Sequence, residues 1–197
     1  MTMRIGEILR KIKRKVLIKY YGLKNVHPTF LASFGLSKVS NDIYAGAYSY
    51  IGPNCIIYPH VTIGNYTMIA NNVSIIGADH NFRVAGVPIV FNGRENLLPT
   101  TIGKDCWIGA NSIIIGGVSI GDGVIVAAGS VVTKNLESYG VYGGIPAIKI
   151  KNRFSTIEEI KLHQEMLDKP LDLIENEFKQ IESWREWESK LKSTSIE

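Results

Sequence analysis

Residues 49–78, SYIGPNCIIYPHVTIGNYTMIANNVSIIGA, carry an aliphatic side chain at every sixth position. The repeat continues after a gap, and its aliphatic members are Ile51, Ile57, Ile63, Ile69, Ile75, Ile102, Ile108, Ile114, Ile120, Val126 and Val132. A mostly small residue stands two positions before each of them. A period of six fits neither an α-helix nor a simple alternating strand. It predicts a short strand and a tight turn per hexad, with three hexads closing a triangular coil of about eighteen residues in a stacked solenoid.

The period breaks once, between Ile75 and Ile102, which are 27 residues apart. Because 27 is not a multiple of six, we expect a loop inserted into the coil at residues 79–100. Long loops inside compact domains are uncommon and are often functional. His80 stands at the base of this loop, and a neutral imidazole can take a proton from a hydroxyl and return it to a leaving group. The residues alone leave His80 either catalytic or part of the loop surface, and Asp79 could orient its ring.

The remaining histidines and both cysteines fit structural positions. His27, His60 and His163 are expected to be surface or structural residues. Only His60 and His80 fall within the coil, so a site with three histidine ligands to a metal is not expected. Cys55 and Cys106 occupy small inward positions of the repeat, which indicates core thiols rather than nucleophiles.

Four stretches resemble segments of the hexapeptide-repeat acetyltransferases, the family of the galactoside, maltose and xenobiotic enzymes. Residues 63–80 resemble the segment that delivers the catalytic histidine, and residues 102–111, IGKDCWIGAN, resemble the W-I-G coil. Residues 124–134, VIVAAGSVVTK, resemble the cofactor coil, and residues 144–147, GIPA, the G-x-P turn. The resemblance spans residues 45–154. It implies a left-handed parallel β-helix, acetyl-CoA as cosubstrate without a metal, His80 as general base, and a homotrimer with active sites between the prisms.

The same resemblance assigns further site residues. Those implied to contact the cofactor are Gly109, Ala110, Ala128, Thr133, Lys134, Pro146, Lys149, Lys151 and Arg153. Basic residues in this set suit the phosphates of CoA. Asp79, Trp107 and Tyr58 are assigned to the acceptor side. Tyr58 stands where the galactoside enzymes carry a carboxylate, which disfavours a free galactoside.

Three functions remain open at this point. We expect transfer of acetyl to a hydroxyl of a sugar, in a surface polysaccharide such as a capsule, exopolysaccharide or O-antigen. Transfer to an antibiotic of the streptogramin or chloramphenicol type is the enzymatic alternative. A β-solenoid scaffold without activity is the third.

The basic charge of the chain is concentrated in residues 1–24, which hold eight Lys or Arg against one Glu. That segment has a net charge of +7, whereas the whole chain has +4, so the rest of the chain has a net charge of −3. We therefore do not expect nucleic-acid binding. Residues 4–20 place five aliphatic residues on one face of an amphipathic helix: Ile5, Ile8, Leu9, Ile12 and Val16. This helix could contact an anionic membrane or cap the end of the prism.

Three parts are expected along the 197 residues: the basic helix (1–24), the β-helix domain (25–154) and a helical extension (155–197). Ser155 and Glu158 form a predicted capping box, and Pro170 divides the extension before a second helix, Leu171 to Leu191. The sequence contains neither a signal-peptide pattern nor a membrane-length apolar run. A cytoplasmic protein is expected, with a possible position at the inner face of the membrane.

Overall fold

The structure, a computed structural model, describes residue 12 and residues 15–33 and 37–178 of the chain. The chain divides into two compact units, Met1–Ser155 and Thr156–Glu197.

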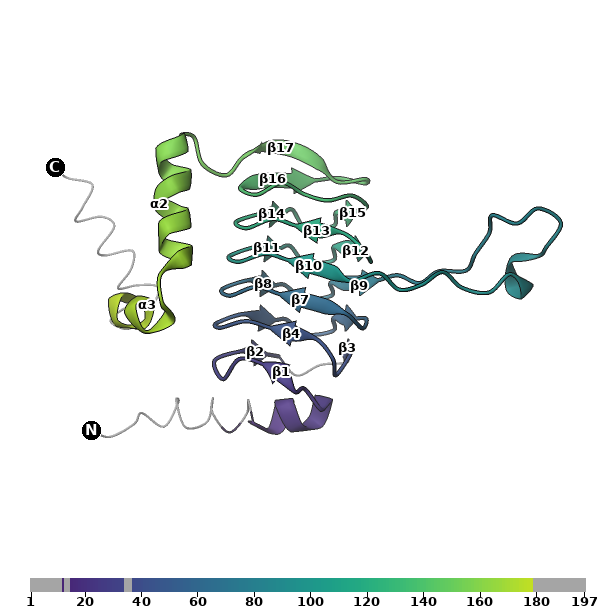
Figure 1. The fold of residues 1–197 in the computed structure, drawn as a ribbon, viewed down its shortest axis with the longest axis horizontal. Coiled ribbons are helices and arrows are strands. Elements are labelled where there is room, and N and C mark those ends of the chain that lie inside the picture. The colour runs from purple at the N-terminus through teal and green to yellow at the C-terminus, as the bar shows by residue number, and fades with distance from the viewer. Residues whose placement is uncertain (1–11, 13–14, 34–36, 179–197) are drawn as a thin grey trace. The chain divides into compact units, whose positions relative to one another are not determined.

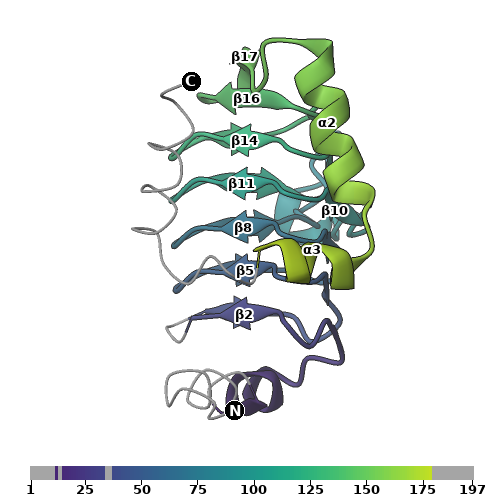
Figure 2. The same ribbon diagram turned by 90° about the vertical axis from the view of Figure 1, so that its left-hand side faces the viewer.

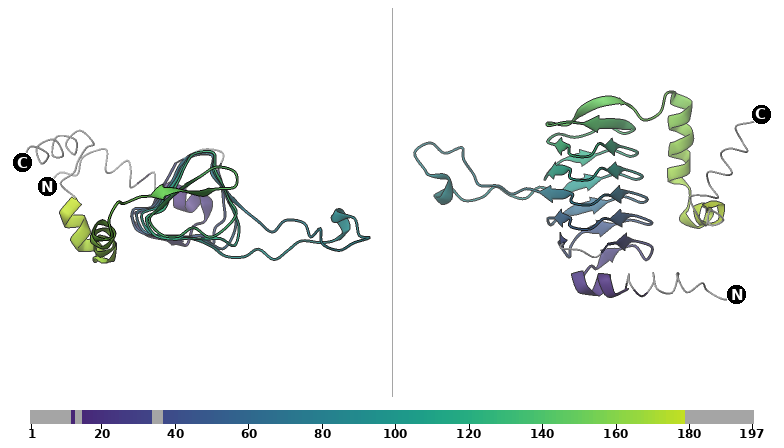
Figure 3. Two further views of the ribbon diagram at one scale, coloured as in Figure 1. Left: turned by 90° about the horizontal axis from the view of Figure 1, so that it is seen from above. Right: turned by 180° about the vertical axis from the view of Figure 1, so that it is seen from behind.

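Most of the first unit is a triangular prism with one sheet on each face (Figures 1 and 3). Sheet A consists of β1 (Asn25–Val26), β4 (Tyr44–Ala45), β7 (Val61–Ile63), β10 (Thr100–Ile102) and β13 (Ser119–Ile120). Sheet B consists of β2 (Leu31–Ala32), β5 (Tyr50–Ile51), β8 (Met68–Ile69), β11 (Trp107–Ile108), β14 (Ile125–Val126), β16 (Gly140–Gly143) and β17 (Ile148–Asn152). Sheet C consists of β3 (Lys38–Val39), β6 (Ile56–Ile57), β9 (Ser74–Ile76), β12 (Ile113–Ile115) and β15 (Val131–Val132).

The regular coils of this prism use eighteen residues. Tyr50 pairs with Met68, and Ile113 with Val131, in parallel register. The final pair, β16 with β17, is antiparallel. The parallel β-helix predicted from the six-residue period is therefore confirmed.

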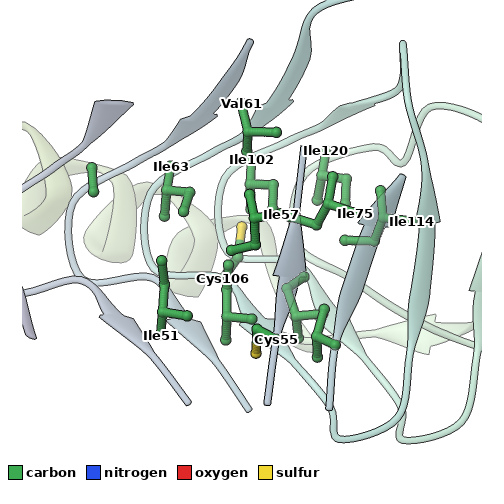
Figure 4. Packing of buried hydrophobic residues seen from close by; sticks show 14 of the residues in the cluster. Ile51, Cys55, Ile57, Val61, Ile63, Ile75, Ile102, Cys106, Ile114 and Ile120 are labelled. Atoms are coloured by element: carbon green, nitrogen blue, oxygen red, sulfur yellow. The ribbon is translucent and has the colours of Figure 1, made fainter. Parts of the chain in front are cut away.

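The interior of the prism is built from the repeat residues. All eleven predicted inward aliphatics are at most 2% exposed, and the small residues two positions before them are at most 5% exposed. Figure 4 shows these side chains stacked from coil to coil. The buried Ser and Thr hydroxyls of the repeat have partners at the corners. Thr67, for example, donates to the Gly103 carbonyl at 2.6 Å. This agrees with the rule that buried polar groups find hydrogen-bond partners.

One coil precedes the repeat that the sequence displays. Its inward positions carry Val26, Ala32, Val39 and Ala45, and Phe30 is fully buried beside them. Three of these strands pair with the next coil, at Ala45–Ile63, Ala32–Ile51 and Val39–Ile57. Small residues and one seven-residue step hide the period here.

The interruption forms a two-stranded arm between β9 and β10. Across it the register jumps from eighteen residues to 39, since Val61 pairs with Thr100. The arm is held as a ribbon by Asn81 N–H donating to Gly93 O and Glu95 N–H to Asp79 O, both at 3.0 Å. Its tip carries a short 3₁₀ helix, η1 (Ile89–Phe91). The arm projects away from the prism (Figures 1 and 3), as expected of an inserted loop.

A helix over residues 15–21 lies at the first coil (Figure 1). Leu17 is 1% exposed and belongs to the prism core, with Ile18 and Tyr21 packed against it. Ile12 and Val16 are more than half exposed. The predicted stripe is therefore not the face that packs on the prism. The other predicted members of that stripe, Ile5, Ile8 and Leu9, lie outside the described residues.

The second unit contains α2 (Ile157–Asp168) and α3 (Leu171–Phe178), seen in Figure 2. The predicted capping box is wrong by one residue. Thr156 is the N-cap: its hydroxyl accepts from Glu159 N–H at 3.2 Å, and its own N–H donates to the Glu159 carboxylate at 2.9 Å. Pro170 separates the helices as predicted, and the predicted continuation to Leu191 lies outside the described residues.

Candidate active site

His80 lies at the root of the arm, at the corner where sheet C passes to sheet A. Its backbone pairs with Arg94 in an antiparallel bridge, and Arg94 Nη1 lies 3.4 Å from the Ala78 carbonyl. The side chain is exposed. Within the described residues, no hydrogen bond or ion pair joins the imidazole to another group, so the ring is available to a substrate.

Two other histidines have structural partners. His60 lies one coil before His80 at the same corner, and its Nδ1 is 3.2 Å from Asp42 Oδ2. The Ser40 hydroxyl, which donates to Asp42 at 2.6 Å, lowers the pKa of that carboxyl, and His60 adds to the effect. His27 Nδ1 contacts the Thr29 hydroxyl at 2.9 Å. These contacts agree with the structural roles expected for both.

The predicted cofactor residues Gly109, Ala110 and Ala128 meet at the corner between sheets B and C, on successive coils. The two coils are joined there by Gly129 N–H donating to Ala110 O at 2.8 Å. A Cβ on Gly109 would stand 2.5 Å from Ala128 N, so only glycine fits. Because the side chains at this corner are short, a narrow chain such as pantetheine could approach the backbone closely.

The other predicted cofactor residues are dispersed. Thr133 and Lys134 are exposed at the corner between sheets C and A, just after β15. Pro146 is exposed in the turn between β16 and β17. Lys149 and Lys151 are exposed on β17, and Lys149 Nζ lies 3.9 Å from Glu137 Oε2.

Arg153 has a different position from the one the resemblance implied. Its Nη1 lies 2.8 Å from Asp105 Oδ2 and also donates to the carbonyls of Asp105 and Gly123 at 3.0 and 3.2 Å. The guanidinium stands over the Phe154 ring, and the side chain is 22% exposed. Arg153 is therefore committed to the prism rather than open to a phosphate.

Sheet C separates the two predicted halves of the site. His80, Asp79 and Tyr58 lie at the corner between sheets C and A. Ala110 lies at the opposite corner, between sheets B and C. Asn72 and Gly77 mark the two corners on the His80 coil, and the five residue steps of extended chain from one to the other span about 16 Å. A single copy does not bring His80 to the cofactor corner.

A groove on sheet B contains Trp107. This side chain is 55% exposed on β11 and lies in register between Met68 and Ile125. The groove has a volume of about 420 Å³. Its main lining residues are the aromatic or apolar Tyr50, Met68 and Trp107 and the amides Asn54, Asn71 and Asn72.

Only Trp107 of the groove residues was predicted. The sequence does contain a signal for the others, because the residue before each inward aliphatic points outward. That position gives Tyr50, Met68 and Trp107 on sheet B. Tyr58 and Asp79 do not line this groove.

No group of three or more His, Cys, Asp or Glu side chains in the described part of the chain could hold a metal ion. No helix in the same residues has the length and apolar character to cross a bilayer.

Two family profiles match the prism: "Bacterial transferase hexapeptide (six repeats)" at residues 46–77 and "Hexapeptide repeat of succinyl-transferase" at residues 99–134. A "Probable macrolide acetyltransferase" of Lysinibacillus sphaericus is 41% identical over 123 residues, 55% of this chain and 65% of that protein. The chain spans about half the length of the curated relatives it matches.

Solved structures share the fold. A maltose O-acetyltransferase from Clostridium difficile 630 superposes with a TM-score of 0.61 at 29% identity, covering 78% of this chain and 80% of that one. A variant of AntD, an N-acyltransferase from Bacillus cereus in complex with dTDP and coenzyme A, superposes with a TM-score of 0.51 at 26% identity. That match covers 78% of this chain and 95% of the other.

Proposed function

The chain belongs to the hexapeptide-repeat family, and on that premise we propose that it is an acetyltransferase that moves acetyl from acetyl-CoA to a sugar hydroxyl. The observation that carries the proposal is the His80 ring, exposed at the root of the arm without a structural partner among the described residues.

In the proposed reaction His80 acts as general base and then as general acid. A ring nitrogen takes the proton of the acceptor hydroxyl while its oxygen attacks the thioester carbonyl carbon. The C–S bond then breaks, and the CoA thiolate receives the proton from the imidazolium. General acid–base assistance of this kind contributes about 10²–10⁴-fold to rate. Because Cys55 and Cys106 are buried, neither thiol is placed to form an acyl-enzyme, and this scheme does not require one.

The short side chains of Gly109, Ala110 and Ala128, at the corner between sheets B and C, support a pantetheine site there. Lys149 and Lys151 on β17 are the proposed partners of the CoA phosphates, because exposed lysines pair readily with phosphate. Thr133, Lys134 and Pro146 complete the proposed cofactor contacts. Arg153 is left out of this set because Asp105 already holds it.

The divided site supports assembly of several copies, and we propose the trimer that the family resemblance implies. Because His80 and Ala110 lie at opposite edges of sheet C, we propose that the arm of one copy brings His80 to the cofactor corner of the next. The arm tip supports this, since Ile89, Val90 and Phe91 are 54–78% exposed. Exposed apolar groups in such a cluster usually mark an interface.

The groove supports a carbohydrate acceptor. The exposed Trp107 ring can stack on the apolar face of a sugar, and the Asn71 amide can bond its hydroxyls. The neighbouring Asn72 Nδ2 already donates to Asn111 Oδ1 at 3.0 Å. In the trimer this groove would belong to a different copy from the His80 it serves. A glycan of a surface polysaccharide is the acceptor we propose, with the enzyme working on the cytoplasmic side of the membrane.

A xenobiotic acceptor is the second candidate. The Lysinibacillus relative named for macrolide acetylation favours it, as do relatives named chloramphenicol acetyltransferases. The lining residues Tyr50, Met68 and Trp107 would also suit such a ligand.

One assay separates these functions. Purified protein is mixed with acetyl-CoA and a panel of oligosaccharides, chloramphenicol and a macrolide, and free thiol is measured. We expect thiol release with an oligosaccharide. Release only with an antibiotic would move the function to the second candidate, and no acceptor-dependent release across the panel would favour a scaffold.

A further inference from the structure

The N-terminal helix has two apolar faces, and the prism uses only one. Leu17 is buried in the core, and Ile18 and Tyr21 pack beside it. Ile12, Val16 and Tyr20 are 54%, 53% and 76% exposed. We call these three residues the outer stripe.

Helical geometry places the two faces on opposite sides. At about 100° per residue, Ile12, Val16 and Tyr20 fall within one quarter of the circumference. The centre of the Leu17, Ile18 and Tyr21 face lies about 150° from the centre of the outer stripe. Capping the prism therefore does not cover the outer stripe.

Positive charge flanks this stripe. Lys15 and Lys19 are exposed and lie along one edge of it on the helix. In the sequence, the segment preceding residue 15 adds further basic residues and continues the same apolar spacing with Ile5, Ile8 and Leu9, all outside the described residues.

We propose that the outer stripe docks on an anionic lipid surface. An apolar stripe edged by lysines inserts its side chains at the headgroup boundary while the ammonium groups meet lipid phosphates. Nucleic acid would use the lysines but not the exposed Ile12, Val16 and Tyr20. The same helix thus caps the prism and anchors it, which goes beyond the acetyl transfer proposed above.

The test is flotation of the full chain with vesicles of phosphatidylcholine alone or mixed with phosphatidylglycerol. The variants are Val16→Glu with Tyr20→Glu, and Lys15→Ala with Lys19→Ala. Tyr44→Glu is the matched control, because Tyr44 is 53% exposed on sheet A. Leu17→Ala tests the capping face.

We expect binding to the phosphatidylglycerol vesicles only, and release at high salt, because salt screens charges beyond about one Debye length. The two-lysine variant should bind about 25-fold more weakly, at about five-fold per basic residue. The stripe variant should lose binding at an unchanged melting temperature, and Tyr44→Glu should bind as the wild type does. Leu17→Ala should lower the melting temperature and keep lipid binding.

Three results would overturn the proposal. One is equal binding to neutral vesicles, or none to anionic ones. A second is a change in the oligomeric mass of the stripe variant, which would assign the stripe to contacts between copies. The third is binding of duplex DNA, without lipid binding, that depends on Lys15 and Lys19 alone. Thiol release with a soluble acceptor is measured alongside, and its failure would concern the acetyltransferase proposal only.

Discussion

Arg153 and Asp105, 48 residues apart in the chain, form an ion pair of 2.8 Å between Nη1 and Oδ2 that joins the end of β17 to the corner after β10. Both side chains are about a quarter exposed. The same nitrogen also bonds two backbone carbonyls, so this contact ties the terminal hairpin to two coils of the prism.

Replacing Arg153 should therefore destabilise the fold. Arg153→Ala should lower the free energy of unfolding by about 1.5–3 kcal/mol, the range for hydrogen bonds to a charged group. Urea denaturation measures this, and Lys151→Ala on the adjoining strand β17 is the control, with no expected loss. Equal stability of wild type and Arg153→Ala would contradict the structural role.

Lys151 should contribute to cofactor binding and not to stability. Lys151→Ala should raise the KM for acetyl-CoA about five-fold at low salt, as expected for one exposed ion pair with a phosphate. Steady-state kinetics checks this, and Lys161→Ala on α2 provides an exposed lysine that should have no effect. An unchanged KM in Lys151→Ala would remove β17 from the phosphate site.

The two histidines at the corner between sheets C and A should behave differently. His80→Ala should reduce acetyl transfer by about 10²–10⁴-fold without loss of stability. His60→Ala, which removes only the contact with Asp42, should keep the activity. Full turnover by His80→Ala would disprove the proposed mechanism.

The arm tip should control assembly. Light scattering should give a mass of about 65 kDa for the wild type, from three chains of 21.8 kDa. Phe91→Asp places a charge on a side chain that is 78% exposed in the single copy, and it should shift the mass toward one chain and abolish activity. Leu162→Asp on α2, 70% exposed, is the comparison. A monomeric wild type with full activity would refute a site shared between copies.

The two thiols should be inert in the folded protein. Burial raises the pKa of Cys106 to about 12 and also raises the pKa of Cys55. The native protein should show no reaction with a thiol reagent at pH 8, and both thiols should react in guanidinium. Early labelling of the native protein would contradict their burial.

The same shift sets a pH dependence of stability. The folded state holds the Cys106 proton more tightly than the unfolded state, whose thiol ionises near pH 9. Stability should therefore fall as pH rises from about 9 toward 12. Cys106→Ser should show a shallower decline over that range in denaturant titrations.

The sequence by itself determined the prism, the arm and the position of His80. Contacts in a solenoid recur at one fixed offset, so Ile57 and Ile75 already show in the sequence which residues will stack. The arm followed from the only break in that period. The first coil was harder to recognise, because Ala32 and Ala45 are too small to mark an inward position.

The tertiary structure decided what the period does not encode. The sequence placed Val16 on the packing stripe, but Leu17 is the buried residue. Which face of the helix packs depends on the direction in which the helix meets the first coil. Asp105 takes Arg153 away from the phosphate site, because the terminal hairpin folds back over a corner 48 residues earlier. The Trp107 groove forms from residues on three successive coils. The buried face of the helix and the Arg153–Asp105 pair depend on contacts between elements that share no repeat, and only the folded chain brings these together. The groove instead follows equivalent repeat positions on β5, β8 and β11.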